Sequence, residues 1–148
     1  MARFTAGLRS TGAGSTTLPV FSLYASASVA PRIREIGMFN TTSTALAVCL
    51  RRYTTAGTSS ALTTTGAPYN LAGSAIAATP RDTHSSTAPT VTAGYLRVAT
   101  IGAAAGAGII WTFGDTGLIV PAGTANGIGV AVYTGTGQIL DWYIDWEA

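Results

Sequence analysis

In residues 134–148, TGTGQILDWYIDWEA, large apolar side chains alternate with mostly polar ones. The large apolar residues take every second position: Leu140, Trp142, Ile144 and Trp146. The positions between them hold three acids and a tyrosine: Asp141, Tyr143, Asp145 and Glu147. Successive side chains of a β-strand point to opposite faces, so this pattern predicts a half-buried strand over the last ten residues. Each inward tryptophan would bury about 150–250 Å² and anchor the core, while the acids would form the solvated face. The alternation alone leaves open whether Trp142 and Trp146 face this chain's own core or a partner subunit.

The composition indicates one domain with an unusually uncharged surface. The chain has 148 residues, and 9% of them are charged, compared with about 25% in typical soluble domains. Such a low content of charged residues suggests that much of the protein surface lies against other subunits. All eight basic residues are arginines, which excludes mechanisms that need a lysine, including the P-loop. The net charge of +2 is too small to indicate nucleic-acid binding, so we expect no nucleic-acid partner.

Cysteine content and hydropathy bear on the compartment. Cys49 is the sole cysteine, which excludes an intrachain disulfide and a cysteine metal cluster, and its apolar neighbours predict a buried, inert thiol. Residues 1–10 lack the apolar region of a secretory signal. The most apolar run, residues 101–111, is too short to span a membrane. We therefore expect a soluble protein made in a cytoplasm, with no membrane partner.

The pattern along the chain is all-β. Short runs of Thr, Val, Ile and aromatic residues alternate with Gly, Pro, Asn and Ser, and no segment has a capped helical period. Residues 1–17 read as an N-terminal arm or edge strand, and residues 18–148 as a single β-sandwich domain. About eight strands with a long crossover favour an antiparallel sandwich of jelly-roll type. An Ig-like sandwich is the alternative, although the cysteine pair of true Ig domains is missing.

Two hairpins are predicted within this sandwich. Residues 32–39 would pair with 45–55 across the turn NTTST, and Gly37 would mark a bulge. Residues 128–134 would pair with 138–146 at the end of the chain. The polar, weakly periodic residues 55–92 suggest a surface excursion with at most one short strand.

The candidates for chemistry are few. His84 lies between Asp82 and Ser85, but sequence neighbours rarely have the geometry of a catalytic triad, and a polar loop histidine is the better interpretation. Asp141 and Asp145 would be about 13 Å apart along a strand, too far to share one metal ion. We therefore predict no catalytic, cofactor-binding or metal site, and no cofactor.

Basic residues supply a candidate interface instead. Arginines on both strands of the predicted central hairpin would form a basic patch, although a solvated strand face is the more usual outcome. With the N-terminal arm, the candidate interface residues are Arg3, Phe4, Leu8, Arg9, Arg32, Arg34, Arg51 and Arg52. Several aromatic residues offer a second kind of site, a sugar platform, although core burial explains most of them equally well: Tyr24, Tyr53, Tyr69, Tyr95 and Trp111.

Three stretches carry a family resemblance: REIGMFNTTSTALAVCLRRYTTAGT (34–58), GAGIIWTFGDTGLIVPAGTANGIGV (106–130) and GTGQILDWYIDWE (135–147). Together they resemble small virion structural proteins of tailed bacteriophages, and most nearly the jelly-roll decoration or cement proteins that coat capsid shells. The similar stretches cover roughly half of the chain. The similarity lies in the general character of the sequence, and it does not include a diagnostic motif.

The resemblance implies a non-enzymatic protein on the capsid surface of the virion, synthesised in the host bacterial cytoplasm. Its expected partners are the major capsid protein and further copies of itself, usually in a homotrimer. No catalytic residue is carried over. A tail, neck or head-fibre component is one alternative, and a carbohydrate-binding module on the virion surface is another.

Overall fold

The computed structural model describes residues 1–61, 66–70, 76–92 and 94–148, and every regular element in these residues is a strand. Sheet A contains β1 (Arg3–Arg9), β3 (Arg32–Asn40), β6 (Ala67–Pro68), β9 (Gly108–Thr112), β10 (Leu118–Ile119) and β12 (Leu140–Glu147). Sheet B contains β2 (Phe21–Ala25), β4 (Leu46–Tyr53), β5 (Thr58–Ala61), β7 (Ala78–Ser85), β8 (Arg97–Ile101) and β11 (Gly127–Thr134).

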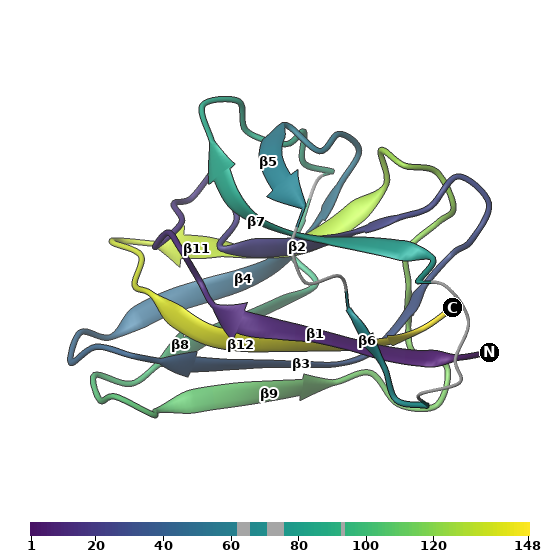
Figure 1. Cartoon of the computed structure of the whole chain (residues 1–148). Helices are drawn as coiled ribbons and strands as arrows, with labels where there is room; N and C mark the ends of the chain where they lie inside the picture. Colours follow the sequence, from purple (N-terminus) through teal and green to yellow (C-terminus); the bar gives the residue numbers. More distant parts are fainter. Residues whose placement is uncertain (62–65, 71–75, 93) are drawn as a thin grey trace.

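The two sheets lie in two layers (Figure 1). The order in sheet A is β10-β3-β12-β1-β6, with β9 also paired to β3, and the order in sheet B is β5-β7-β2-β11-β4-β8. All of these pairs are antiparallel. The predicted all-β antiparallel sandwich is therefore confirmed.

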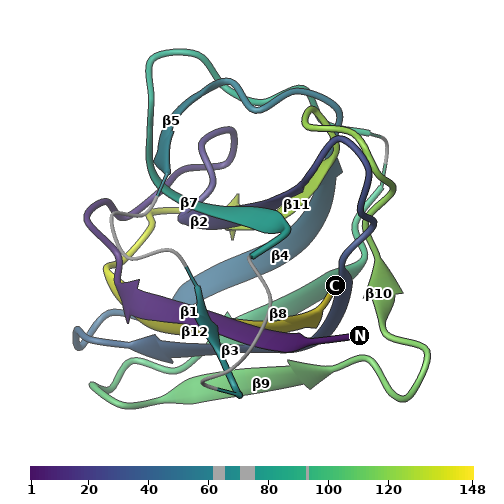
Figure 2. The ribbon, with the colours of Figure 1, turned by 45° about the vertical axis from the view of Figure 1, so that its right-hand side comes forward.

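Four of the strand pairs are nested one inside the next. β1 pairs with β12, β2 with β11, β3 with β9, and β4 with β8. A chain makes this pattern when it folds back on itself once as a long hairpin that then rolls into two sheets. The eight strands thus form two layers, β1-β12-β3-β9 and β2-β11-β4-β8, and the jelly-roll type stays a prediction. β5, β6, β7 and β10 add to the two sheets outside this arrangement (Figure 2).

The core lies between the sheets and depends on the tryptophans of β12. Trp142 and Trp146 are 3% and 0% exposed, which confirms the predicted alternation and places both rings inside this subunit. Trp142 stacks on Phe21 of β2 with centroids 4.2 Å apart, so it joins the two layers. Trp146 stacks on Phe4 of β1 at 5.8 Å.

Both predicted hairpins are wrong, because each connection crosses from one sheet to the other. β3 lies in sheet A and β4 in sheet B, and β11 and β12 are divided in the same way. Buried Asn40 holds the first crossing: its Nδ2 donates to Thr44 O (2.7 Å) and Gly102 O (3.0 Å), and its Oδ1 accepts from Thr42 N (3.0 Å). The turn NTTST is therefore an arch between the layers.

Two smaller expectations also differ from the structure. The register shift between β3 and β12 falls between Asp145 and Trp146, so Gly37 is not at a bulge and pairs in register with Tyr143. The segment 55–92 contains β5, β6 and the eight-residue β7, more strand than predicted. Residues 62–65 and 71–75 of that segment lie outside the described residues.

The N-terminal segment belongs to the sandwich. All seven residues of β1 pair with β12, and Phe4 is 1% exposed. Residues 3–9 are therefore not a free arm, because their apolar side chains are needed to cover Trp146. β1 is nonetheless close to the edge of sheet A, since, of the strands that the structure describes, the two-residue β6 is the one that lies beyond it.

Candidate functional site

The candidate interface residues divide between the two sheets. Four of the arginines lie on the outer face of sheet A: Arg3 and Arg9 on β1, Arg32 and Arg34 on β3. Arg51 and Arg52 lie on β4 in sheet B, so no single hairpin presents one basic patch. The two apolar members face inward: Phe4 is a core residue and half-buried Leu8 packs against the core. Burial removes Phe4 from any contact with a partner.

Three of the four arginines on sheet A, Arg3, Arg9 and Arg34, are ion-paired with acids of β12. Arg9 binds Asp141 through two bonds, Nε to Oδ1 at 2.7 Å and Nη2 to Oδ2 at 2.9 Å. Arg34 Nη2 donates to Glu147 Oε2 at 2.7 Å. These guanidinium groups lower the pKa of both carboxyl groups. The acids between the large apolar residues of β12 therefore bind cations from both neighbouring strands.

Asp145 is more enclosed than a solvated strand face would allow. It is 4% exposed, and its Oδ2 accepts bonds from Arg3 Nη2 at 3.2 Å and from the Tyr69 hydroxyl at 2.5 Å. The Arg3 guanidinium also lies over the Tyr69 ring, 4.7 Å from its centroid. Burial and the neighbouring carboxylate raise the pKa of Tyr69. The prediction of a solvated position is therefore wrong for Asp145, because Arg3 and Tyr69 cover it.

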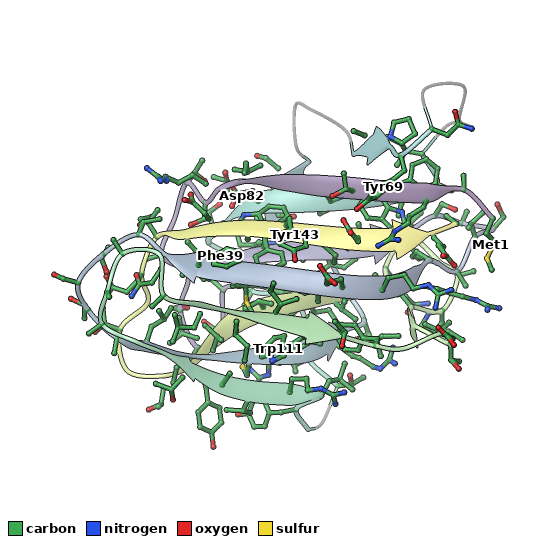
Figure 3. All side chains as sticks on the ribbon, turned by 90° about the horizontal axis from the view of Figure 1, so that it is seen from below. Met1, Phe39, Tyr69, Asp82, Trp111 and Tyr143 are labelled. Carbon is green, nitrogen blue, oxygen red and sulfur yellow. The ribbon has the colours of Figure 1, made fainter. Side chains whose placement is uncertain are left out.

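Two aromatic side chains lie down on the same face (Figure 3). The Tyr143 ring crosses Gly37 on the neighbouring strand, and its hydroxyl donates to Glu35 Oε1. Phe39 crosses Gly108 on β9 in the same way. The two rings are 6.5 Å apart between centroids and inclined by 23°. Each glycine gives a ring room to lie on the backbone, because a Cβ atom there would collide with it.

The outer face of sheet B is covered by its own loops. Tyr24 and Tyr53 are 1% and 2% exposed although they are not part of the cluster between the sheets. The Tyr24 hydroxyl donates to Thr55 O at 3.0 Å. Arg51 donates to Thr16 O at 3.0 Å and lies over the Tyr95 ring, 4.9 Å from its centroid. Loops around Thr16 and Thr55 therefore close this face.

Arg52 borders two small hollows at one end of sheet B. Its Nη1 donates to Ile119 O at 2.8 Å, which fixes the guanidinium against β10. One hollow, of about 110 Å³, is lined by Arg52, Tyr53, Thr54, Thr92, Pro121, Asn126 and Gly127. The other, of about 80 Å³, is lined by Arg52, Thr92, Gly94, Tyr95 and Leu96. No described acidic residue lines either hollow.

His84 is not in a loop, and its partners differ from those considered in the sequence. It lies on β7, where its Nε2 is 2.8 Å from Ser22 Oγ, and burial lowers its pKa to about 4. Asp82 accepts bonds from the backbone and hydroxyl of Thr11 instead. Ser22 is 0% exposed. A substrate therefore has no access to this serine, and the half-buried histidine binds it within sheet B.

The five aromatic residues considered as a sugar platform do not come together. Tyr24, Tyr53 and Trp111 are buried, whereas Tyr69 and Tyr95 are exposed next to different sheets. The rings that do share an open face, Phe39 and Tyr143, were not predicted. The sequence feature that marks these two rings is a glycine directly opposite each of them on the neighbouring strand. This feature can be recognised only once the strand register is known.

In the described ranges, no group of three or more His, Cys, Asp or Glu side chains is placed to hold a metal ion. The same residues include no helix long and apolar enough to cross a membrane. Comparison with known proteins found no matching family model, no matching curated protein and no matching solved structure.

Proposed function

We propose that this chain is a structural, non-enzymatic subunit of a bacteriophage virion that decorates the capsid shell, binds the major capsid protein and associates with copies of itself as a homotrimer. It would be made in the cytoplasm of the bacterial host. The observation that carries the proposal is an uncharged, exposed side of the sandwich where both sheets end. The family resemblance of the sequence and the nested strand order agree with it.

This uncharged side consists of residues 98–114, which include no charged residue. β8 ends sheet B and β9 ends sheet A, and the exposed residues 102–106 belong to the connection between them. Val98 is 47% exposed and Ile110 is 50% exposed. Open strand edges in soluble proteins are usually protected from other strands by charge, proline or a cover. An edge without charge is suited to contact another protein chain.

In this proposal the arginines contribute less to the contact with a partner than the basic patch expected from the sequence. Arg9 and Arg34 are bound to acids of their own sheet, and Arg51 and Arg52 donate to backbone carbonyls of their own chain. An arginine that is already paired gains less from a partner surface. The main contact with the shell or a neighbouring copy is therefore assigned to the uncharged side, with arginines at its margin.

The first test is the copy number of this chain in purified virions, measured by quantitative mass spectrometry against the major capsid protein. Hundreds of copies are expected of a decoration protein. A few to a few dozen copies would replace the proposal with a tail, neck or head-fibre role. Complete absence from virions would overturn the virion assignment.

A second test addresses the uncharged side directly. Val98→Asp and Ile110→Asp place a charge on each edge strand, and both are expected to abolish self-association in analytical ultracentrifugation and shell binding in sedimentation assays. Thr124→Asp lies in an exposed loop whose neighbouring Gly123 N donates to Ser26 O, and this matched control should leave both unchanged. Normal binding by both edge variants, with normal thermal melts, would rule out this side as the contact.

A further inference from the structure

The aromatic pair on sheet A forms a continuous surface. Tyr143 and Phe39 come from adjacent strands, and both rings lie across glycines instead of standing up from the sheet. A separation of 6.5 Å with an inclination of 23° places them side by side. We refer to Phe39 and Tyr143 as the ring pair. Both side chains remain partly exposed, so the pair presents a shallow aromatic floor.

Hydrogen-bonding groups border the ring pair on both sides. Glu35 accepts the Tyr143 hydroxyl through Oε1. On the other side, Asp141 stands opposite Phe39 in the strand register and is bound by Arg9. A ligand on the rings would therefore meet acceptors and donors in the plane of the sheet.

The charges on this face cancel. The charged side chains that β1, β3 and β12 contribute to it are four arginines and four carboxylates: Arg3, Arg9, Arg32, Arg34, Glu35, Asp141, Asp145 and Glu147. A nucleic acid or an acidic peptide gains nothing from a neutral surface. A protein partner would have to dehydrate ion pairs that are already satisfied, which costs more than it returns. A neutral ligand rich in hydroxyl groups avoids both penalties.

We propose that the outer face of sheet A binds a neutral polysaccharide, with two neighbouring pyranose rings lying on Phe39 and Tyr143. The C–H face of a pyranose carries partial positive charge and is attracted to the negative face of an aromatic ring. Hydroxyl groups at the ring edge donate to Glu35 and accept from Arg9. The ring pair borders the uncharged side, because Phe39 lies across Gly108 of β9. Val98→Asp, on the other sheet, separates the two proposals, because it is expected to abolish self-association and to leave polysaccharide binding unchanged.

The first test is affinity electrophoresis of the full chain in gels that contain a neutral polysaccharide. The gels would hold a β-glucan, a mannan, a galactan or a soluble chitin oligomer free of chitosan. Titration calorimetry then measures the affinity for each polysaccharide that retards the protein. Wild-type protein is expected to be retarded by at least one of these. Phe39→Ala and Tyr143→Ala are each expected to weaken binding about tenfold or more, the loss that corresponds to one stacking contact. Tyr133→Ala removes an exposed tyrosine of sheet B and is expected to bind like wild type.

Variants that keep volume guard against loss of folding. Phe39→Leu removes the aromatic face but keeps an apolar side chain, and it should also weaken binding while its thermal melt stays close to wild type. Tyr143→Phe keeps the ring and should retain most of the affinity. The proposal is overturned if none of the polysaccharides retards the wild-type chain, or if Phe39→Leu binds as tightly as wild type. Loss of capsid-shell binding in Phe39→Ala, without any polysaccharide binding, would reassign the face to a protein partner.

Discussion

The outer faces of the two sheets have similar strand alternation but opposite surroundings. On sheet A, outward residues such as Tyr143 and Asp141 remain partly exposed, and its acids are bound by arginines from neighbouring strands. On sheet B, Tyr53 and Cys49 are 2% and 0% exposed although they point away from the core between the sheets. The difference arises because loops around Thr16 and Thr55 cover the outer face of sheet B. Alternation thus tells which side of a sheet a residue faces, but not whether that side is open.

The largest effect is expected from deletion of residues 1–15. The deletion removes β1 from sheet A, and Phe4 alone contributes about 3–5 kcal/mol of burial against a total stability of about 5–15 kcal/mol. It also removes Ser15, whose carbonyl accepts from Val132 N at 3.1 Å on sheet B. We expect the truncated chain to show no cooperative urea unfolding transition. A cooperative transition near the wild-type midpoint would restore the interpretation of this segment as a dispensable arm.

The second-largest effect is expected from substitution of a glycine on the closed outer face of sheet B. The matched comparison is a glycine on the open outer face of sheet A. A Cβ atom added at Gly129 would lie 2.7 Å from the Phe21 carbonyl oxygen, a backbone atom under the closed face. A Cβ atom added at Gly37 would meet the Tyr143 ring, which can swing toward solvent on the open face. We expect Gly129→Ala to lower the free energy of unfolding by about 2–3 kcal/mol and Gly37→Ala by about 1 kcal/mol. Urea titrations of both variants measure the difference, and equal costs would contradict the distinction between open and closed faces.

Acid should destabilise the closed face first. Burial lowers the pKa of His84 to about 4 in the folded chain, whereas an unfolded histidine has a pKa of about 6.5. Between these values the unfolded state binds more protons, so stability is complete above about pH 6.5 and decreases as the pH falls toward about 4. Because the ring is only half-buried, we expect a loss of about 2 kcal/mol.

The control for this pH effect is His84→Gln, which should flatten the dependence in that window when thermal melts are compared at pH 7, 5.5 and 4.5. The lowered pKa values of Asp141 and Glu147 act in the same direction but only at lower pH, since their stabilisation is present above the unfolded pKa of a carboxyl group, about 4. An unchanged pH profile in the variant would exclude His84 as the source.

The smallest effect is expected on the open face. Arg9 and Asp141 are well exposed, with side chains 66% and 48% accessible, so water and salt screen their attraction. We expect Arg9→Gln to leave the urea midpoint within experimental error. A clear loss of stability that disappears at high salt would show that this ion pair matters more than its exposure indicates.

Much of the architecture was predictable from local patterns. The parity of β12 correctly put Trp142 and Trp146 on one apolar face, and the runs of short strands correctly gave an all-β sandwich. Whether that face met this chain's own core or a partner subunit was decided only by the structure. The choice of partner strand was not predictable in the same way. The turn NTTST looks like a hairpin connection, but buried Asn40 holds it as an arch between sheets. Local sequence indicates that the chain turns and does not reveal which layer it enters next.

The sites were harder to predict than the fold, because they depend on register. The arginines were selected as a group, but their pairing with the acids of β12 follows from which residues stand side by side in three adjacent strands. Likewise, Tyr143 lies next to Gly37 only because β3 and β12 pair in this register. A shift of one residue would move these side chains to opposite faces.

The nesting of strand pairs also has a kinetic consequence. Because β1 pairs with β12, β1 is synthesised well before the strand that covers its inward side chains. Native contacts that join distant parts of a chain slow folding and lengthen the time during which apolar strands are exposed. Refolding of this protein should therefore be slow for its size, and its yield should fall as the concentration rises, with Phe4 and Trp146 among the last residues to become protected from solvent.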